Sequence, residues 1–159
     1  MVLLVAGTLS CSRRLSDQET IFAAWNCPAR IGGSVRAELQ AHPNHEAVSD
    51  GMYIYKTSGP KAEQRTVRIQ GEGDTILWIQ IEDRPHAADP VAEHQRYENE
   101  VDRLTDLLGE PRKNGNRLSI TRQAHWTDHP SLWVDLRLSV STDPAYASRI
   151  LSVRRKTDQ

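Results

Sequence analysis

The stretch Leu132-Trp133-Val134-Asp135-Leu136-Arg137-Leu138-Ser139-Val140 has an aliphatic residue at every second position. Successive side chains of a β-strand point to opposite faces of a sheet, so this period of two predicts a strand with one buried face. A slip of one residue would expose the whole aliphatic set, and the register is therefore well specified. The pattern places Trp133, Asp135 and Arg137 on the outward face.

Two further strands are predicted on either side of this one. A strand over 118–126 precedes it, with Ile120, Ala124 and Trp126 on its inward face, and residues 128–131 supply turn chemistry between the two. A last strand is predicted near 149–154, ahead of a short basic tail that we expect to be solvated.

The clearest helix covers about residues 90–108. Asp89 can cap its first turn, Pro90 suits the first helical position, and Gly109 ends it. An apolar stripe places one side of the helix on the sheet, and it consists of Tyr97, Val101, Leu104 and Leu108. The charged residues of the helix, Glu93 among them, are expected to face mostly toward water.

Three more strands are predicted before that helix, over 52–55, 66–70 and 75–81. The third is apolar on both faces, which predicts a central strand with packing on each side. Short turns between strands imply mostly antiparallel pairing. The fold class is therefore α+β in a βββ-α-βββ order, with the long helix on one sheet face.

A short helix is predicted at the start of this domain. Ser16-Asp17-Gln18-Glu19 has the spacing of a capping box, and Cys27-Pro28 ends the helix because the residue before proline is pushed out of helical space. Residues 29–50 are predicted to form an irregular connector, in which Val35 to Gln40 have the pattern for one further helical turn. We assign residues 12–156 to one domain.

Residues 1–11 are apolar up to Leu9 and end in Ser10-Cys11. This segment resembles the end of a bacterial lipoprotein signal, which implies lipidation of Cys11, membrane attachment and a periplasmic or cell-envelope address. It departs from that pattern because no Lys or Arg precedes the apolar run. The alternative is an N-terminal strand in a cytoplasmic protein. The apolar run is too short for a transmembrane helix.

Charge limits the classes of partner. The 20 basic and 21 acidic residues give a net charge of −1. The chain therefore lacks the excess positive charge that is typical of a general nucleic-acid-binding protein. The sequence has no Walker loop, His-Glu-x-x-His motif or nucleophile elbow, and its six histidines are scattered. We therefore expect no catalytic residues, no cofactor and no metal.

The outward face of the 132–140 strand carries the one suggestive surface feature. Trp133 lies beside Asp135 and Arg137, with His125 on the preceding strand, and exposed Trp with Arg is typical of a protein interface. These four residues are the predicted partner-binding site. The alternative is that the N-terminal helix covers this face and buries Trp133.

The sequence therefore predicts a small non-enzymatic binding module of a bacterial envelope, which binds a protein partner through its open sheet face. One alternative is an inhibitor of immunity type that neutralises a protein partner through the same face. A second alternative, from another class, is a hydrolase that uses His125 with Asp128 or Asp135.

Overall fold

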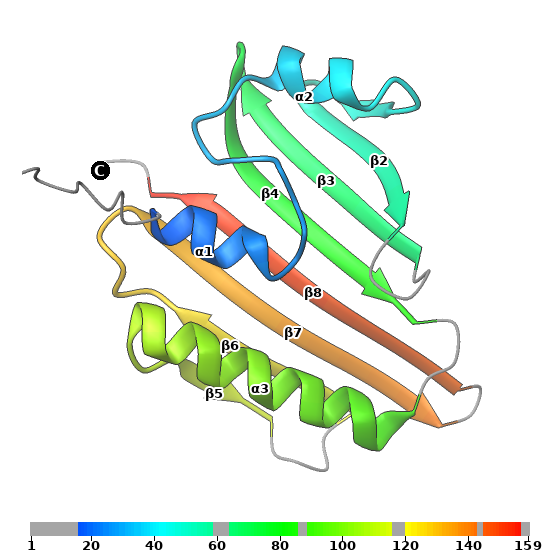
Figure 1. Cartoon of the computed structure of the whole chain (residues 1–159), viewed down its shortest axis with the longest axis vertical. Coiled ribbons are helices and arrows are strands. Elements are labelled where there is room, and N and C mark those ends of the chain that lie inside the picture. The colour runs from blue at the N-terminus through cyan, green and yellow to red at the C-terminus, as the bar shows by residue number, and fades with distance from the viewer. Residues whose placement is uncertain (1–15, 59–63, 86–88, 116–119, 143–144, 157–159) are drawn as a thin grey trace, which may run out of the picture.

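The computed structural model describes residues 16–58, 64–85, 89–115, 120–142 and 145–156. Within them, eight strands form one antiparallel sheet in the order β1-β2-β3-β4-β8-β7-β6-β5 (Figure 1). The helices are α1 (Asp17–Ala23), α2 (Val35–Ala41) and α3 (Pro90–Leu108). The strands are β1 (Glu46–Ser49), β2 (Met52–Ser58), β3 (Gln64–Glu72), β4 (Thr75–Arg84), β5 (Arg112–Asn114), β6 (Thr121–Trp126), β7 (Leu132–Thr142) and β8 (Ala145–Arg155).

The sheet is built from two meanders that meet at its centre. Strands β1 to β4 form the first meander and β5 to β8 the second, and β4 pairs with β8 in antiparallel register. Each meander follows a helix, α2 in the first half and α3 in the second. The two halves therefore repeat one order of elements, although no repeat is visible in the residues.

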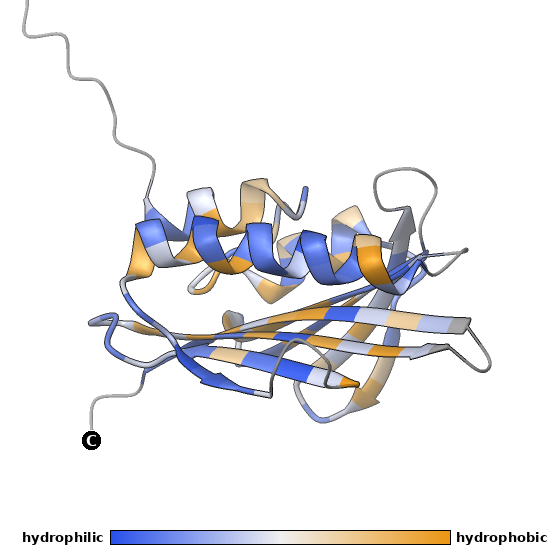
Figure 2. Cartoon of the chain, turned by 90° about the horizontal axis from the view of Figure 1, so that it is seen from below, coloured by the Kyte–Doolittle hydropathy of each residue, from blue (hydrophilic) through white to orange (hydrophobic). Residues whose placement is uncertain are grey.

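The helices lie on one face of the sheet, and among the described residues no helix lies on the other face (Figure 2). Residues paired across antiparallel strands point to the same side, so the register sorts every strand residue to a face. Val134 pairs with Val153, and Val153 pairs with Ile79. These side chains are buried under the helices, and we call the opposite side the open face.

The α+β class, the antiparallel sheet and the long helix packed on it agree with the sequence prediction. Two strands, β1 and β5, were not predicted. The segment predicted to be irregular contains α2, at the place where one helical turn was allowed. Strand β4 is central, as predicted, but helices cover only one of its faces. Ile120 was predicted to point inward and is 71% exposed, because β6 begins after it.

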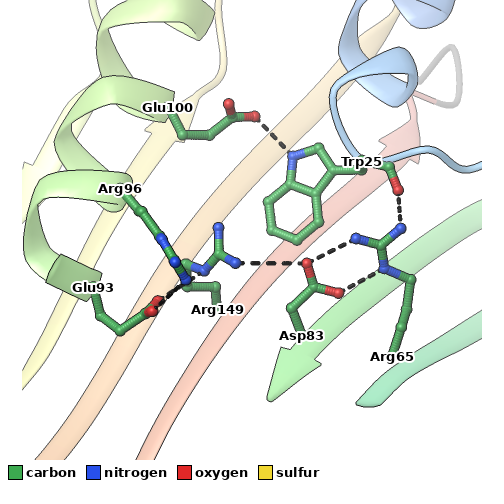
Figure 3. A network of polar contacts seen from close by, with 7 residues as sticks. All are labelled: Trp25, Arg65, Asp83, Glu93, Arg96, Glu100 and Arg149. Carbon is green, nitrogen blue, oxygen red and sulfur yellow. Dashed lines mark hydrogen bonds and ion pairs between the residues drawn. The ribbon is translucent and has the colours of Figure 1, made fainter. Parts of the chain in front are cut away.

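A buried ionic network joins the segment after α1 and helix α3 to the sheet beneath them (Figure 3). Arg65 on β3 donates two hydrogen bonds to Asp83 on β4, of 2.6 and 2.8 Å, and a third to the backbone carbonyl of Trp25 just after α1. Arg149 on β8 lies 3.8 Å from the same Asp83 carboxylate. The network therefore joins the loop after α1 to three neighbouring strands.

The same network reaches α3. Glu93, in its first turn, binds Arg149 at 3.0 Å and Arg96 at 2.7 Å, while Glu100 accepts a 2.7 Å hydrogen bond from the Trp25 indole. Glu93 is only 1% exposed, so the prediction that it faces water is wrong. A helical period cannot reveal an arginine that a distant strand supplies beneath the helix.

Candidate functional site

The open face carries a row of large side chains that the strand register aligns. Trp78 on β4 pairs with Arg154 on β8, and Arg154 pairs with Trp133 on β7. In the next row, Ser152, Asp135 and His125 follow one another across β8, β7 and β6. Directly opposite residues are about 5 Å apart, so each row forms a continuous band of side chains.

These two rows line a hollow of about 540 Å³ on the open face. Its volume lies within the range of small-molecule and side-chain pockets. Trp133 is 38% exposed at its wall, and Arg137 is exposed beside it. Its lining includes Trp78, His125, Trp133, Asp135, Arg137 and Arg154.

Arg154 separates the two tryptophans of the hollow. Its guanidinium carbon lies 3.9 Å from the centroid of the Trp133 ring, which is cation–π distance. On the other side, Trp78 donates a 2.7 Å hydrogen bond from Nε1 to Oγ of Ser152. Both indoles are thus held by contacts within the sheet, and they present aromatic surface without first having to become ordered.

His125 and Asp135 form the ionisable pair of the hollow. His125 Nδ1 lies 2.5 Å from Asp135 Oδ2, and the Gln123 amide donates a 2.9 Å hydrogen bond to the same oxygen. A carboxylate that accepts from Nδ1 leaves Nε2 available for proton exchange. Because Asp135 lies between His125 and Ser152 in the row, the three do not form a Ser-His-Asp relay, which needs histidine in the middle.

A second carboxylate of the open face is also engaged by the protein itself. Glu82 on β4 accepts hydrogen bonds from Arg84 at 2.7 Å, Ser148 at 3.0 Å and Arg68 at 3.1 Å. Burial alone would raise the pKa of Glu82, but these hydrogen bonds outweigh it and hold the pKa below its ordinary value. Glu82 therefore stays ionised and neutralises part of the charge of its two arginine partners.

The structure brings all four sequence-predicted site residues, Trp133, Asp135, Arg137 and His125, to this hollow. The alternative in which the N-terminal helix buries Trp133 is wrong, because α1 packs on the opposite face through Ile21 and Phe22. The prediction did not include Trp78 and Arg154. Trp78 was missed because its strand is apolar on both faces, so no alternation marks an exposed side. Arg154 was missed because it begins a run of basic residues that resembles a solvated tail.

A second hollow, of about 590 Å³, lies beside α2. It is lined in part by Leu39, Tyr53 and Asp74. The Asp74 carboxylate is already bonded to the Ser34 hydroxyl at 2.8 Å and to the Arg36 backbone N–H at 2.7 Å. These bonds lower the pKa of Asp74, the one to Arg36 most. They close the loop before α2 onto the turn between β3 and β4.

Three further predictions concern features away from the open face. In the described ranges no three His, Cys, Asp or Glu side chains gather in a group that could hold a metal ion. No helix of the described part is long and apolar enough to cross a membrane. Cys11 and the rest of residues 1–11 lie outside the described residues, whereas Cys27 is described and buried.

Comparison of the chain with protein-family models, with curated proteins and with solved structures finds no match.

Proposed function

We propose that this protein is a non-enzymatic binding module that docks a protein partner on its open sheet face, at the hollow around Trp133. The observation that carries the proposal is the row Trp78, Arg154 and Trp133 on a face that no described helix covers. Tryptophan and arginine dominate the energetics of protein interfaces because they combine large apolar area with directed polar groups.

The open face contributes little to the core, which supports a role in recognition. The aliphatic side chains of β7 are buried on the helix side, whereas Trp133 and Arg137 on the same strand remain exposed. A large aromatic residue that is exposed although the fold does not need it there is better explained by an interaction than by stability.

We further propose a bacterial cell-envelope address, periplasmic or attached to a membrane through lipidated Cys11. The support is the sequence of residues 1–11 alone. Intact mass and membrane fractionation of the protein expressed from its native locus test this part. A chain that starts at Cys11 with added lipid mass supports it, whereas an unprocessed soluble chain favours the cytoplasmic immunity-type inhibitor.

Photo-crosslinking in the native host tests the docking face. A photoreactive phenylalanine analogue replaces Trp133 in one variant and Asp102, on the exposed side of α3, in a control. We expect one discrete adduct from position 133, and the purified partner should then bind the wild-type protein in titration calorimetry. If that partner binds Trp133→Ala as tightly as wild type, the proposed face is wrong.

The His125–Asp135 contact of 2.5 Å favours one further candidate, a hydrolase in which His125 acts as the general base. Asp128, the other carboxylate considered for it, contacts the hydroxyl of Thr127 at 3.2 Å. Hydrolysis of chromogenic esters by the wild-type protein, abolished in His125→Asn but not in Trp133→Ala, would establish this candidate in place of the binding module.

A further inference from the structure

The open face is basic although the whole chain is nearly neutral. The chain carries a net charge of −1. The strand register places six cations on the open face: Lys56, Arg68, Arg84, Arg112, Arg137 and Arg154. The same register places fewer carboxylates on this face, among them Glu46, Glu82 and Asp135, and a face with an excess of cations attracts an oppositely charged surface.

The central carboxylates of this face are bonded to other residues of the protein, whereas not all of its cations are paired with a carboxylate. Glu82 is bonded to Arg68 and Arg84, and Asp135 is bonded to His125 and Gln123. Arg137 makes no ion pair with another residue of the described part, and Arg154 rests on the ring of Trp133. The hollow therefore offers two guanidinium groups whose charge no carboxylate of the described residues neutralises.

Aromatic surface lies directly beside these cations. Arg154 pairs with Trp78 on one side and with Trp133 on the other, and Arg137 is two residues further along β7 from Asp135. A guanidinium fork binds a carboxylate through two parallel hydrogen bonds, and an indole binds an apolar side chain. The hollow thus combines sites for carboxylates with a site for an apolar residue.

We propose that the hollow recognises an acidic segment of the partner protein, with carboxylates on Arg137 and Arg154 and an apolar side chain against Trp78 and Trp133. This inference rests on the proposed docking function and names the chemistry of the partner. It places no bound ligand in the buried core and requires no movement of the helices.

The charge pattern favours an acidic protein segment over a nucleic acid. Asp135 lies between Trp133 and Arg137 on β7, so a half-buried carboxylate interrupts the cations of the hollow. It would repel a phosphate chain, whose charge is continuous along the strand. An acidic segment of a protein can space its carboxylates to match separate arginines. Arg154 also occupies one side of the Trp133 ring, so only the other side is left for a stacked base.

Three probes of defined chemistry test the proposal on the full-length protein. The first is a blocked twelve-residue peptide of Glu, Gly and Leu, the second has Lys in place of every Glu, and the third is a twelve-nucleotide oligothymidine. The indole N–H signals in NMR spectra report the site, because Trp78 and Trp133 line the hollow from the open face. Trp126 also borders the hollow, but Trp126 and Trp25 are only 1% and 3% exposed, so their signals should respond less. Trp78→Phe and Trp133→Phe assign the signals.

We expect the acidic peptide to shift the signals of Trp78 and Trp133, and its affinity to fall about tenfold in Arg137→Glu, equivalent to about 1.4 kcal/mol. Lys113→Glu is the matched control, because it makes the same charge change on β5 at a residue whose side chain lies on the opposite face. Its affinity should stay within about twofold of wild type. Circular dichroism verifies that both variants are folded.

The proposal is overturned if the lysine peptide or the oligothymidine binds as tightly as the acidic peptide, or if both charge variants weaken binding equally. These outcomes are distinguishable from failure of the proposed function. A partner that crosslinks at position 133 through a neutral or basic segment overturns the acidic inference alone. Absence of any crosslink at position 133 overturns the docking face itself.

Discussion

Arg65 and Asp83 face each other on the neighbouring strands β3 and β4, and two hydrogen bonds of 2.6 and 2.8 Å join them in a bidentate pair. Each residue is 2% exposed. Arg149 approaches the same carboxylate at 3.8 Å from β8. One buried carboxylate thus serves two buried or half-buried arginines beneath the helices.

Asp83→Asn should destabilise the protein by about 3–5 kcal/mol, because it leaves a buried arginine without its counter-charge. Urea unfolding followed by circular dichroism measures the change in unfolding free energy. The slope of that free energy against urea concentration should be unaltered. Asp102→Asn, on the exposed side of α3, is the control and should change stability by less than about 0.5 kcal/mol. Equal small effects of both substitutions would contradict the structural role assigned to the network.

Substitution of the two tryptophans of the β6–β7 hairpin by alanine should cost very different amounts of stability. Trp126 is 1% exposed and donates a 2.9 Å hydrogen bond to the carbonyl of Gly109, so Trp126→Ala should cost about 3–5 kcal/mol. Trp133→Ala removes a side chain from the open face and should cost about 1 kcal/mol or less. Thermal unfolding of the two variants compares them directly. A large loss with Trp133→Ala would mean that Trp133 serves stability.

Cys27 should be unreactive in the folded protein. Burial raises the pKa of its thiol to about 11, so almost no thiolate is present near neutral pH, and its side chain is inaccessible. In a Cys11→Ser background, the rate of modification by Ellman's reagent should be at least about a hundredfold lower in buffer than in denaturant. Rapid labelling of the folded chain would show that the segment after α1 opens readily.

The contribution of Glu82 to stability should depend on pH. Its pKa is lower in the folded protein than its ordinary value, so the stabilisation is present above about pH 4.3 and is lost as pH falls through the folded value. The difference in unfolding free energy between wild type and Glu82→Gln should therefore shrink between about pH 6 and about pH 3. The exposed Glu72→Gln is the control, with a difference near zero throughout. A difference in unfolding free energy that grows as the pH falls would contradict the contacts assigned to Glu82.

The strands with an amphipathic or apolar pattern were predictable, and the short polar ones were not. Strand β7 has a strict period of two, and α3 has caps at both ends, so both follow from local rules. Every residue of β1 and β5 is exposed, so no buried apolar pattern marks these strands. They form because their neighbours offer unpaired backbone groups, which is a property of the assembled sheet.

The candidate site was predictable only along its own strand. The alternation of β7 places Trp133, Asp135 and Arg137 on one face, and the hairpin adds His125. Trp78 and Arg154 enter the hollow because β4 and β8 pair at the centre of the sheet, and this pairing joins residues far apart in the chain. No pattern within one strand specifies such a pairing.

The division of each central strand between a helix side and an open side also bears on how such a surface changes through evolution. On β7, the residues that pack beneath the helices and the residues of the open face alternate one by one. A substitution at an open-face position therefore leaves the packing beneath the helices intact. Under the proposed docking function, substitutions at every second codon of β6, β7 and β8 would change the partner with the scaffold unchanged.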